Sequence, residues 1–157
     1  MKKLLIPALA VIGLSTVVMA QDKQKKAPVK IVYNGQAYLS GGKYATGGIG
    51  KKALDSLIPL PLVVKDSLGK EHKATSFKFT YGEIGAFEDE RGKLIFDTDW
   101  TSYSTEGSSI NESLKKMLPE TKWGDTLVID EIFYEIATGK TKSLQRAKPI
   151  KLYINDK

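Results

Sequence analysis

Short runs in which apolar and polar residues alternate recur along most of this chain, and they constrain the fold more than any other feature. Phe77, Phe79 and Tyr81 alternate with polar neighbours, and residues 150–154 repeat the pattern near the carboxyl end. Such alternation places apolar side chains on one face of a strand and leaves the other face in water. The pattern therefore predicts antiparallel strands that are buried on one side.

About eight strands follow from these runs and from the turn-forming residues between them. They are expected at Val29 to Tyr33, Ala37 to Ser40, Leu62 to Lys65, Thr75 to Tyr81, Lys93 to Asp97, Trp100 to Ser104, Thr126 to Ile136 and Ile150 to Ile154. Glycine turns at Arg91-Gly92 and at Ala137 to Lys140 are expected to close hairpins, the second of them between the last two strands.

One helix is marked by Ser109, which stands three residues before Glu112 as in a capping box. Apolar residues at helical spacing follow, and Pro119 ends the pattern. A weaker helical turn is expected over residues 51–57. The pattern as a whole predicts a mainly β chain, folded as an immunoglobulin-like antiparallel β-sandwich with one short helix packed on it.

The amino terminus has the composition of an export signal. Lys2 and Lys3 precede the apolar stretch Leu4 to Ala20, which ends in small residues. This pattern predicts a signal peptide over residues 1–20, cut between Ala20 and Gln21, and a periplasmic mature protein. An uncleaved membrane anchor is the alternative, although the stretch is short for one. Residues 21–28 are polar and are expected to form a flexible leader before a single domain at 29–157.

Composition limits the chemistry of the chain. Cysteine is absent and His72 is the single histidine, so disulfides, thiolate metal sites and histidine-based triads have no residues to build them. His72 stands among charged residues and is expected in an exposed turn. The chain is therefore expected not to be an enzyme, with no catalytic residue, no metal site and no cofactor.

Three charged or glycine-rich stretches have two interpretations each. The glycines between Gly41 and Lys52 do not match the spacing of a phosphate loop, so structural turns are expected there. The acidic residues between Glu83 and Glu106 could bind calcium, but solvation of a hairpin is favoured. The carboxyl-terminal hairpin is rich in basic residues, namely Lys140, Lys142, Arg146, Lys148 and Lys151. These residues could contact an anionic polysaccharide, a lipid headgroup or an acidic protein. Solvation of a sheet edge is again the favoured interpretation. No nucleic-acid motif is present.

Across Leu39 to Asn155 the sequence resembles the carboxyl-terminal periplasmic domain of the gliding-motility protein GldM, whose family also serves the type IX secretion motor. Three stretches carry the resemblance: Ser40-Gly41-Gly42-Lys43 with Ile49 to Leu54, Ser76 to Phe79, and Trp123 to Ile132 continuing through Gly139 to Ile150. Full-length members have a transmembrane helix and a rod of periplasmic β domains that dimerise. This chain has no room for the rod.

The resemblance implies a stand-alone, non-catalytic module that binds a protein of the cell envelope, with a homodimer as one form and no integral membrane span after signal cleavage. Contacts could use sheet edges or the aromatic residues Tyr38, Tyr44, Trp100, Tyr103 and Trp123. Core positions are expected for these aromatics, except for Tyr44 in its glycine-rich loop. A small carbohydrate-binding or hydrolase domain of the envelope is the alternative function.

Overall fold

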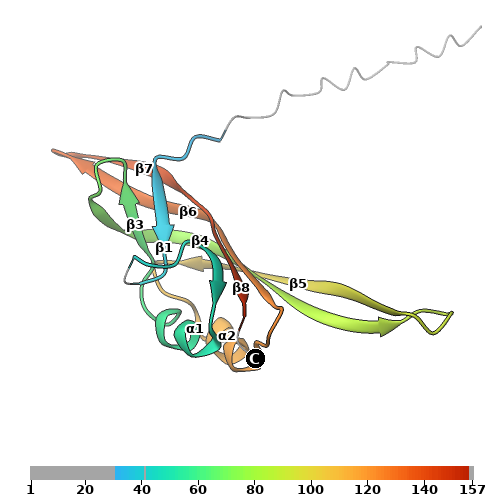
Figure 1. Ribbon diagram of the computed structural model, residues 1–157. Helices are drawn as coiled ribbons and strands as arrows, with labels where there is room; N and C mark the ends of the chain where they lie inside the picture. The colour runs from blue at the N-terminus through green and yellow to red at the C-terminus, as the bar shows by residue number, and fades with distance from the viewer. Residues whose placement is uncertain (1–30, 41, 156–157) are drawn as a thin grey trace, which may run out of the picture. The chain divides into compact units, whose positions relative to one another are not determined.

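The computed structural model describes residues 31–40 and 42–155 (Figure 1). The expected signal peptide, its cleavage site between Ala20 and Gln21 and the leader at 21–28 lie outside these residues. The elements are β1 (Gly35–Tyr38), β2 (Thr46–Ile49), α1 (Lys51–Leu57), β3 (Val63–Asp66), β4 (Glu71–Glu88), β5 (Leu94–Glu106), α2 (Glu112–Met117), the 3-10 helix η1 (Leu118–Glu120), β6 (Thr126–Thr138), β7 (Thr141–Lys148) and β8 (Ile150–Ile154).

Five strands close into a barrel. Around the ring, β1 pairs with β3, β3 with β4, β4 with β6 and β6 with β7, all antiparallel. The ring closes through a short parallel contact in which Gly35 and Gln36 of β1 face Ala147 and Lys148 of β7. Closure removes sheet edges that would otherwise need protection.

Two of the barrel strands are much longer than the barrel requires. The first residues of β4 pair with β3, and its remainder runs on beside β5 up to the Glu88–Leu94 pair. The carboxyl half of β6 pairs with β7, and its amino half pairs with β8, which in turn pairs with β2. Consequently β4 and β6 each leave the barrel and extend into hairpins or outer strands (Figure 1).

Irregular pairing accompanies this change of partners. The β4–β6 ladder shifts register between Ala74 and Ser76 and again between Ser76 and Lys78. Glu131, opposite this region on β6, has a φ of 48° and is the single non-glycine residue of the described chain with a positive φ. Bulges of this kind bend a strand and increase its twist. They let two long strands enter a small barrel and leave it again.

The core lies inside the barrel and under the two short helices. Phe79, Leu127, Ile129 and Tyr134 are fully buried strand residues, and Leu54 and Leu114 attach α1 and α2 to them. The amino end of α2 is capped by Asn111, whose side-chain oxygen accepts a hydrogen bond of 3.0 Å from the backbone N–H of Leu114. Within the described residues, neither helix is long and apolar enough to span a membrane.

The mainly β class expected from the sequence is confirmed. The finer arrangement differs, because the pairings close a five-stranded barrel instead of outlining the two facing sheets of an immunoglobulin-like sandwich. Two helices are present in the described chain where one was expected, since the weak turn at 51–57 forms α1. The expected helix cap at Ser109 was wrong, because the backbone turns helical only after Asn111.

Strand boundaries also differ in places. The runs at 93–97 and 100–104 join into the single strand β5, and the expected hairpin at Gly139 connects β6 to β7 instead of to the last strand. Strand β2 was not expected, because Thr46 to Ile49 contains two glycines and shows no alternation. Residues 31–33 are not a strand, and the rest of the strand expected there lies outside the described residues.

Glu131 provides a test of the bulge. Replacing it by glycine should stabilise the domain by about 0.5–1 kcal/mol, because a left-handed backbone costs about 1–2 kcal/mol for a residue with a Cβ and the added chain entropy offsets part of the gain. Glu131→Ala keeps the strain and removes the carboxylate, so it should stay within about 0.5 kcal/mol of wild type. Urea unfolding of both variants measures the difference; equal stabilities would contradict strain at this position.

Candidate functional site

A cluster of exposed large apolar residues lies on the hairpin formed by β4 and β5; its members are Phe87, Leu94, Ile95, Phe96 and Trp100. The pairing of β4 with β6 ends at Gly82 and Thr126, and beyond that point β4 has β5 as its one strand partner. We call residues 82–100 the arm. Figure 1 shows it running away from the helices as a two-stranded ribbon.

A buried carboxylate holds the root of the arm. Asp125 is completely buried, and its Oδ1 accepts a 3.0 Å hydrogen bond from the backbone N–H of Ile84 on the arm. Its Oδ2 accepts from the Tyr81 hydroxyl and, at 2.8 Å, from the backbone N–H of Lys122. Burial, and then the hydrogen bond to Asp125, raise the pKa of Tyr81, so this phenol remains a donor. The backbone of Ile84, two residues beyond the last β4–β6 pair, is therefore tied to the core.

An ion pair adds to this attachment. The Lys122 ammonium lies 2.7 Å from Oε1 of Glu83, the residue before Ile84. The hydrogen bond to Glu83 raises the pKa of Lys122. Since both side chains are about half exposed, the pair adds little stability by itself. It orients the turn before β6 against the arm.

One face of the arm is apolar. Directly opposed residues of two paired strands point to the same side, so the register places the apolar residues Ile84, Ala86, Leu94, Phe96 and Trp100 together. Thr98, opposite Ile84, and Glu88, opposite Leu94 at the tip, are the polar residues of that side. The side chains of Leu94, Phe96 and Trp100 are 62%, 68% and 56% exposed. The Trp100 ring lies over Gly82, where a Cβ would come within 2.6 Å of it. We call these five residues the apolar face.

The opposite face of the arm carries carboxylates. Glu83 is paired across the ribbon with Asp99, and Gly85 with Asp97, while Phe87 and Ile95 form the outermost pair. We call Glu83, Asp97 and Asp99 the acidic face. The whole arm holds six carboxylates and two cations, Arg91 and Lys93. Its local charge is therefore strongly negative.

The outer edge of β5 is unpaired in the described chain, because β5 is the last strand in the sheet order. An edge of this length exposes backbone N–H and C=O groups that can pair with another strand. Natural proteins usually shorten, twist or charge such edges. Here Glu83, Asp97 and Asp99 lie on one face, whereas the large apolar residues Leu94, Phe96 and Trp100 remain exposed on the other.

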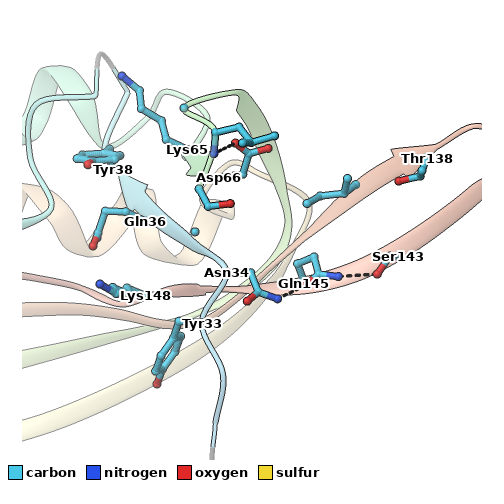
Figure 2. A pocket seen from close by; sticks show the side chains of 15 residues that line it. Tyr33, Asn34, Gln36, Tyr38, Lys65, Asp66, Thr138, Ser143, Gln145 and Lys148 are labelled. Carbon is cyan, nitrogen blue, oxygen red and sulfur yellow. Dashed lines mark hydrogen bonds between the residues drawn. The ribbon is translucent and has the colours of Figure 1, made fainter.

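A second feature is a groove of about 910 Å3 beside the seam where the barrel closes (Figure 2). The parallel contact between β1 and β7 covers two residue pairs, so the strands separate beyond it. The groove lies between the segment entering β1, the turn after β3, and the far ends of β6 and β7. Its polar lining includes Asn34, Gln36, Ser143, Gln145 and Lys148.

The turn after β3 forms one wall of the groove and is organised by Asp66. The Oδ1 atom of Asp66 accepts 2.9 Å hydrogen bonds from the backbone N–H groups of Leu68 and Lys70, and its Oδ2 lies 2.9 Å from Nε2 of His72. The hydrogen bond from His72 is the largest effect and lowers the pKa of Asp66. Burial opposes it, and the backbone N–H groups of Lys70 and Leu68 lower the pKa further. Both oxygens of this carboxylate therefore already take part in hydrogen bonds within the protein.

His72 was expected in an exposed turn, and that expectation was wrong. It lies on β4, opposite Val64 of β3, and its side chain is 9% exposed. Its ring centre is 5.3 Å from that of Tyr134 inside the barrel. The charged neighbours of His72 point outward because they occupy the alternate positions of the same strand.

Five aromatic residues were named from the sequence as possible contact residues, and the burial of several of them differs from what was expected. Trp100 and Trp123 are 56% and 60% exposed, whereas core positions were expected for both. Tyr44, for which exposure was expected, packs against the core together with Tyr103. Tyr38 is half-buried at the groove. Trp100 stays exposed because no further layer of the described chain covers the arm.

The carboxylates between Glu83 and Glu106 are spread along the arm. Asp89 accepts backbone hydrogen bonds from Arg91 and Lys93 at the tip, and Glu83 pairs with Lys122. In the described part of the chain, no group of three or more histidine, cysteine or acidic side chains is placed to hold a metal ion.

Several basic side chains near the carboxyl end already form an ion pair or lie over an aromatic ring. Lys142 pairs with Glu135 at 2.9 Å, and the Lys151 ammonium lies 5.3 Å from the centre of the Tyr153 ring. The Arg146 guanidinium lies 5.6 Å from the Phe133 ring centre and 5.8 Å from that of Tyr33. Lys148 lines the groove.

Comparison of the chain with protein-family models and with curated proteins found no match.

Asp66 makes stability depend on pH. A folded-state pKa below its ordinary value of 3.8 means that the unfolded chain binds a proton first as the pH falls. Asp66 therefore stabilises the fold above that value, and the contribution is lost as the pH falls through the folded-state pKa. Urea unfolding between pH 7 and pH 2 should show a shallower loss for Asp66→Asn than for wild type. Identical pH profiles would contradict this; Glu90→Gln, at the exposed tip of the arm, is the control and should follow the wild type.

Proposed function

We propose that this chain is an exported, non-catalytic protein-protein interaction module of the cell envelope, and that the arm is its contact surface. The single observation that carries the proposal is the apolar face, where Leu94, Phe96 and Trp100 are each more than half exposed on a ribbon held at its root by Asp125. Burying one such side chain contributes about 1.5–3 kcal/mol. Contiguous exposed apolar groups of this kind mark interaction sites.

The unpaired edge of β5 indicates how a partner would bind. An extended segment that adds beside β5 would form main-chain hydrogen bonds and send alternate side chains to the two faces of the ribbon. One set would meet the apolar face, and the other would meet Asp97 and Asp99. The partner segment suited to this edge therefore alternates apolar and basic residues.

A second copy of the chain fits the β5 edge less well. Symmetric antiparallel pairing of two β5 strands centred on any residue from Asp97 to Asp99 would set an aspartate of one copy opposite an aspartate of the other, and like charges in that position are destabilising. We therefore propose a different protein as the occupant of the arm, and a homodimer would have to form through another surface.

The resemblance to the carboxyl-terminal domain of the GldM family supports an envelope partner in gliding motility or type IX secretion. Residues 1–20 support export by their signal-like pattern, with cleavage between Ala20 and Gln21. Because of this signal-like pattern, we propose that the mature protein is periplasmic. The proposed activity requires no cofactor and no metal.

A hydrolase would need two carboxylates facing each other in a cleft. Among the described residues, Asp130 is the carboxyl group whose pKa is raised, chiefly by burial, and Lys78 and Arg146 oppose that effect. Asp130 does not line the groove, where Asp66 has its pKa lowered. No observation therefore favours hydrolysis over binding.

The proposal is tested by crosslinking in cells that naturally make the protein. A photoreactive phenylalanine analogue at Phe96 should crosslink to a discrete partner in the envelope fraction. Replacing both Asp97 and Asp99 by lysine should lower the yield by about tenfold or more, because the partner's basic side chains would then be repelled.

Two matched controls accompany this experiment. The same analogue at Leu68, which is 91% exposed on the turn after β3, should give no such product. Replacing Glu90 and Glu112 by lysine makes the same change of charge away from the two faces of the arm, at its tip and on α2, and should alter the yield by less than about twofold. Equal crosslinking from Phe96 and Leu68, or equal effects of the two double substitutions, would contradict the proposal.

A further inference from the structure

The groove at the barrel seam has features that the proposed contact surface does not use. It is formed by different elements from the arm, and its volume of about 910 Å3 is in the range of ligand-binding sites. Its outer walls are the segment before β1 and the end of β7, and the turn held by Asp66 forms the third side. The walls are therefore ordered by hydrogen bonds within the protein.

Neutral polar groups dominate the chemistry of the groove. Asn34 donates its side-chain amide to Oε1 of Gln145, and Gln145 in turn donates to the Ser143 hydroxyl, so the three side chains form a continuous chain along the wall (Figure 2). Gln36 lies on β1 beside them. Each amide and hydroxyl group can both donate and accept hydrogen bonds. Such groups match ligands that carry many hydroxyls, which also donate and accept.

Aromatic rings flank these amides. Tyr33 and Tyr38 both line the groove, and each is accompanied by a cation: the Arg146 guanidinium lies 5.8 Å from the Tyr33 ring centre and the Lys65 ammonium 5.7 Å from that of Tyr38. A tyrosine ring offers an apolar face beside a polar hydroxyl. That combination suits the ring of a sugar, which has C–H groups on one side and hydroxyls at its rim.

The charge of the groove favours an anion. Its charged lining residues are Lys65, Asp66 and Lys148, and the two oxygens of Asp66 are already used by the turn and by His72. Lys65 is 3.5 Å from Glu71, a loose pair on the outer side of the turn. No ion pair joins Lys148 to a carboxylate in the part of the chain that the structure describes.

We propose that this groove binds a segment of an acidic polysaccharide, with a uronic-acid carboxylate near Lys148 and the sugar hydroxyls on Asn34, Gln36 and Gln145. The inference goes beyond the protein-binding role of the arm and does not depend on it. A peptide fits less well, because an unpaired strand edge suits main-chain recognition better than a wall of side-chain amides. The site would attach the module to a charged envelope or surface glycan while the arm remains free.

The test measures binding of oligosaccharides to the full chain by calorimetry. The acidic probes are hexamers of galacturonate, of alginate and of hyaluronate, and the neutral probe is the methyl ester of hexagalacturonate. At least one acidic hexamer should bind saturably, and the ester of galacturonate should bind at least about tenfold more weakly than its parent where the parent binds. Lys148→Glu should lower the affinity by about tenfold or more.

Lys140→Glu is the matched control, because it makes the same change of charge on the same hairpin at a residue that does not line the groove. It should change the affinity by less than about twofold. The proposal is overturned if no acidic hexamer binds saturably, if Lys140→Glu and Lys148→Glu weaken binding equally, or if a hexaglutamate peptide binds as tightly as the best glycan. The crosslinking at Phe96 is unaffected by any of these results, so the two proposals fail separately.

Discussion

The buried carboxylate of Asp125 is the contact on which the placement of the arm depends. It receives three hydrogen bonds, from the Tyr81 hydroxyl and from the backbone N–H groups of Ile84 and Lys122. Hydrogen bonds to a charged group are worth about 1.5–3 kcal/mol each, and a buried donor that loses its acceptor costs a comparable amount. Asp125 thus joins Tyr81 in the buried part of β4, Ile84 on the arm and the turn that begins β6.

One chain presents two separate surfaces because strand pairing ends at two different places. Strands β4 and β6 each change partners along their length. One part of each strand belongs to the barrel, and the rest pairs with a strand outside it. At the arm, β4 continues with β5 alone, and its apolar face has no second layer to cover it. At the seam, β1 and β7 meet over two residue pairs and then separate around the groove. The arm therefore arises where β4 continues beyond its pairing with β6, and the groove arises where β1 and β7 separate.

The sequence predicted those parts of the fold that depend on local burial or local backbone conformation. Alternation at 77–81 places Phe77 and Phe79 in the core, as expected. The turn at Gly139 forms where a positive φ was needed, and its φ is 63°. Closure of the barrel could not be predicted in this way, because it depends on contacts between residues such as Gly35 and Ala147, which are far apart in the chain. Local patterns carry no signal for such a pairing.

The candidate surfaces were predicted less completely than the strands. Size and hydrophobicity favoured a core position for Trp100, but exposure is decided by whether another layer covers the ribbon, and none does in the described chain. His72 looked like a turn residue because of its charged neighbours, although alternate positions on a strand give the same local composition. Nothing in the local sequence around Asp125 indicates that Tyr81 and Ile84 converge on its carboxylate.

Hydrogen exchange of the arm amides most directly tests whether Asp125 holds the arm in place. In Asp125→Asn, one carboxylate oxygen becomes an amide group that cannot accept from the donors around it. The account predicts that amides of residues 83–88 in β4 lose their protection in this variant by about tenfold or more, while those of β8 keep theirs. Asp99→Asn, on the exposed part of the arm, should leave both sets unchanged. Equal protection of the arm in wild type and Asp125→Asn would contradict the account.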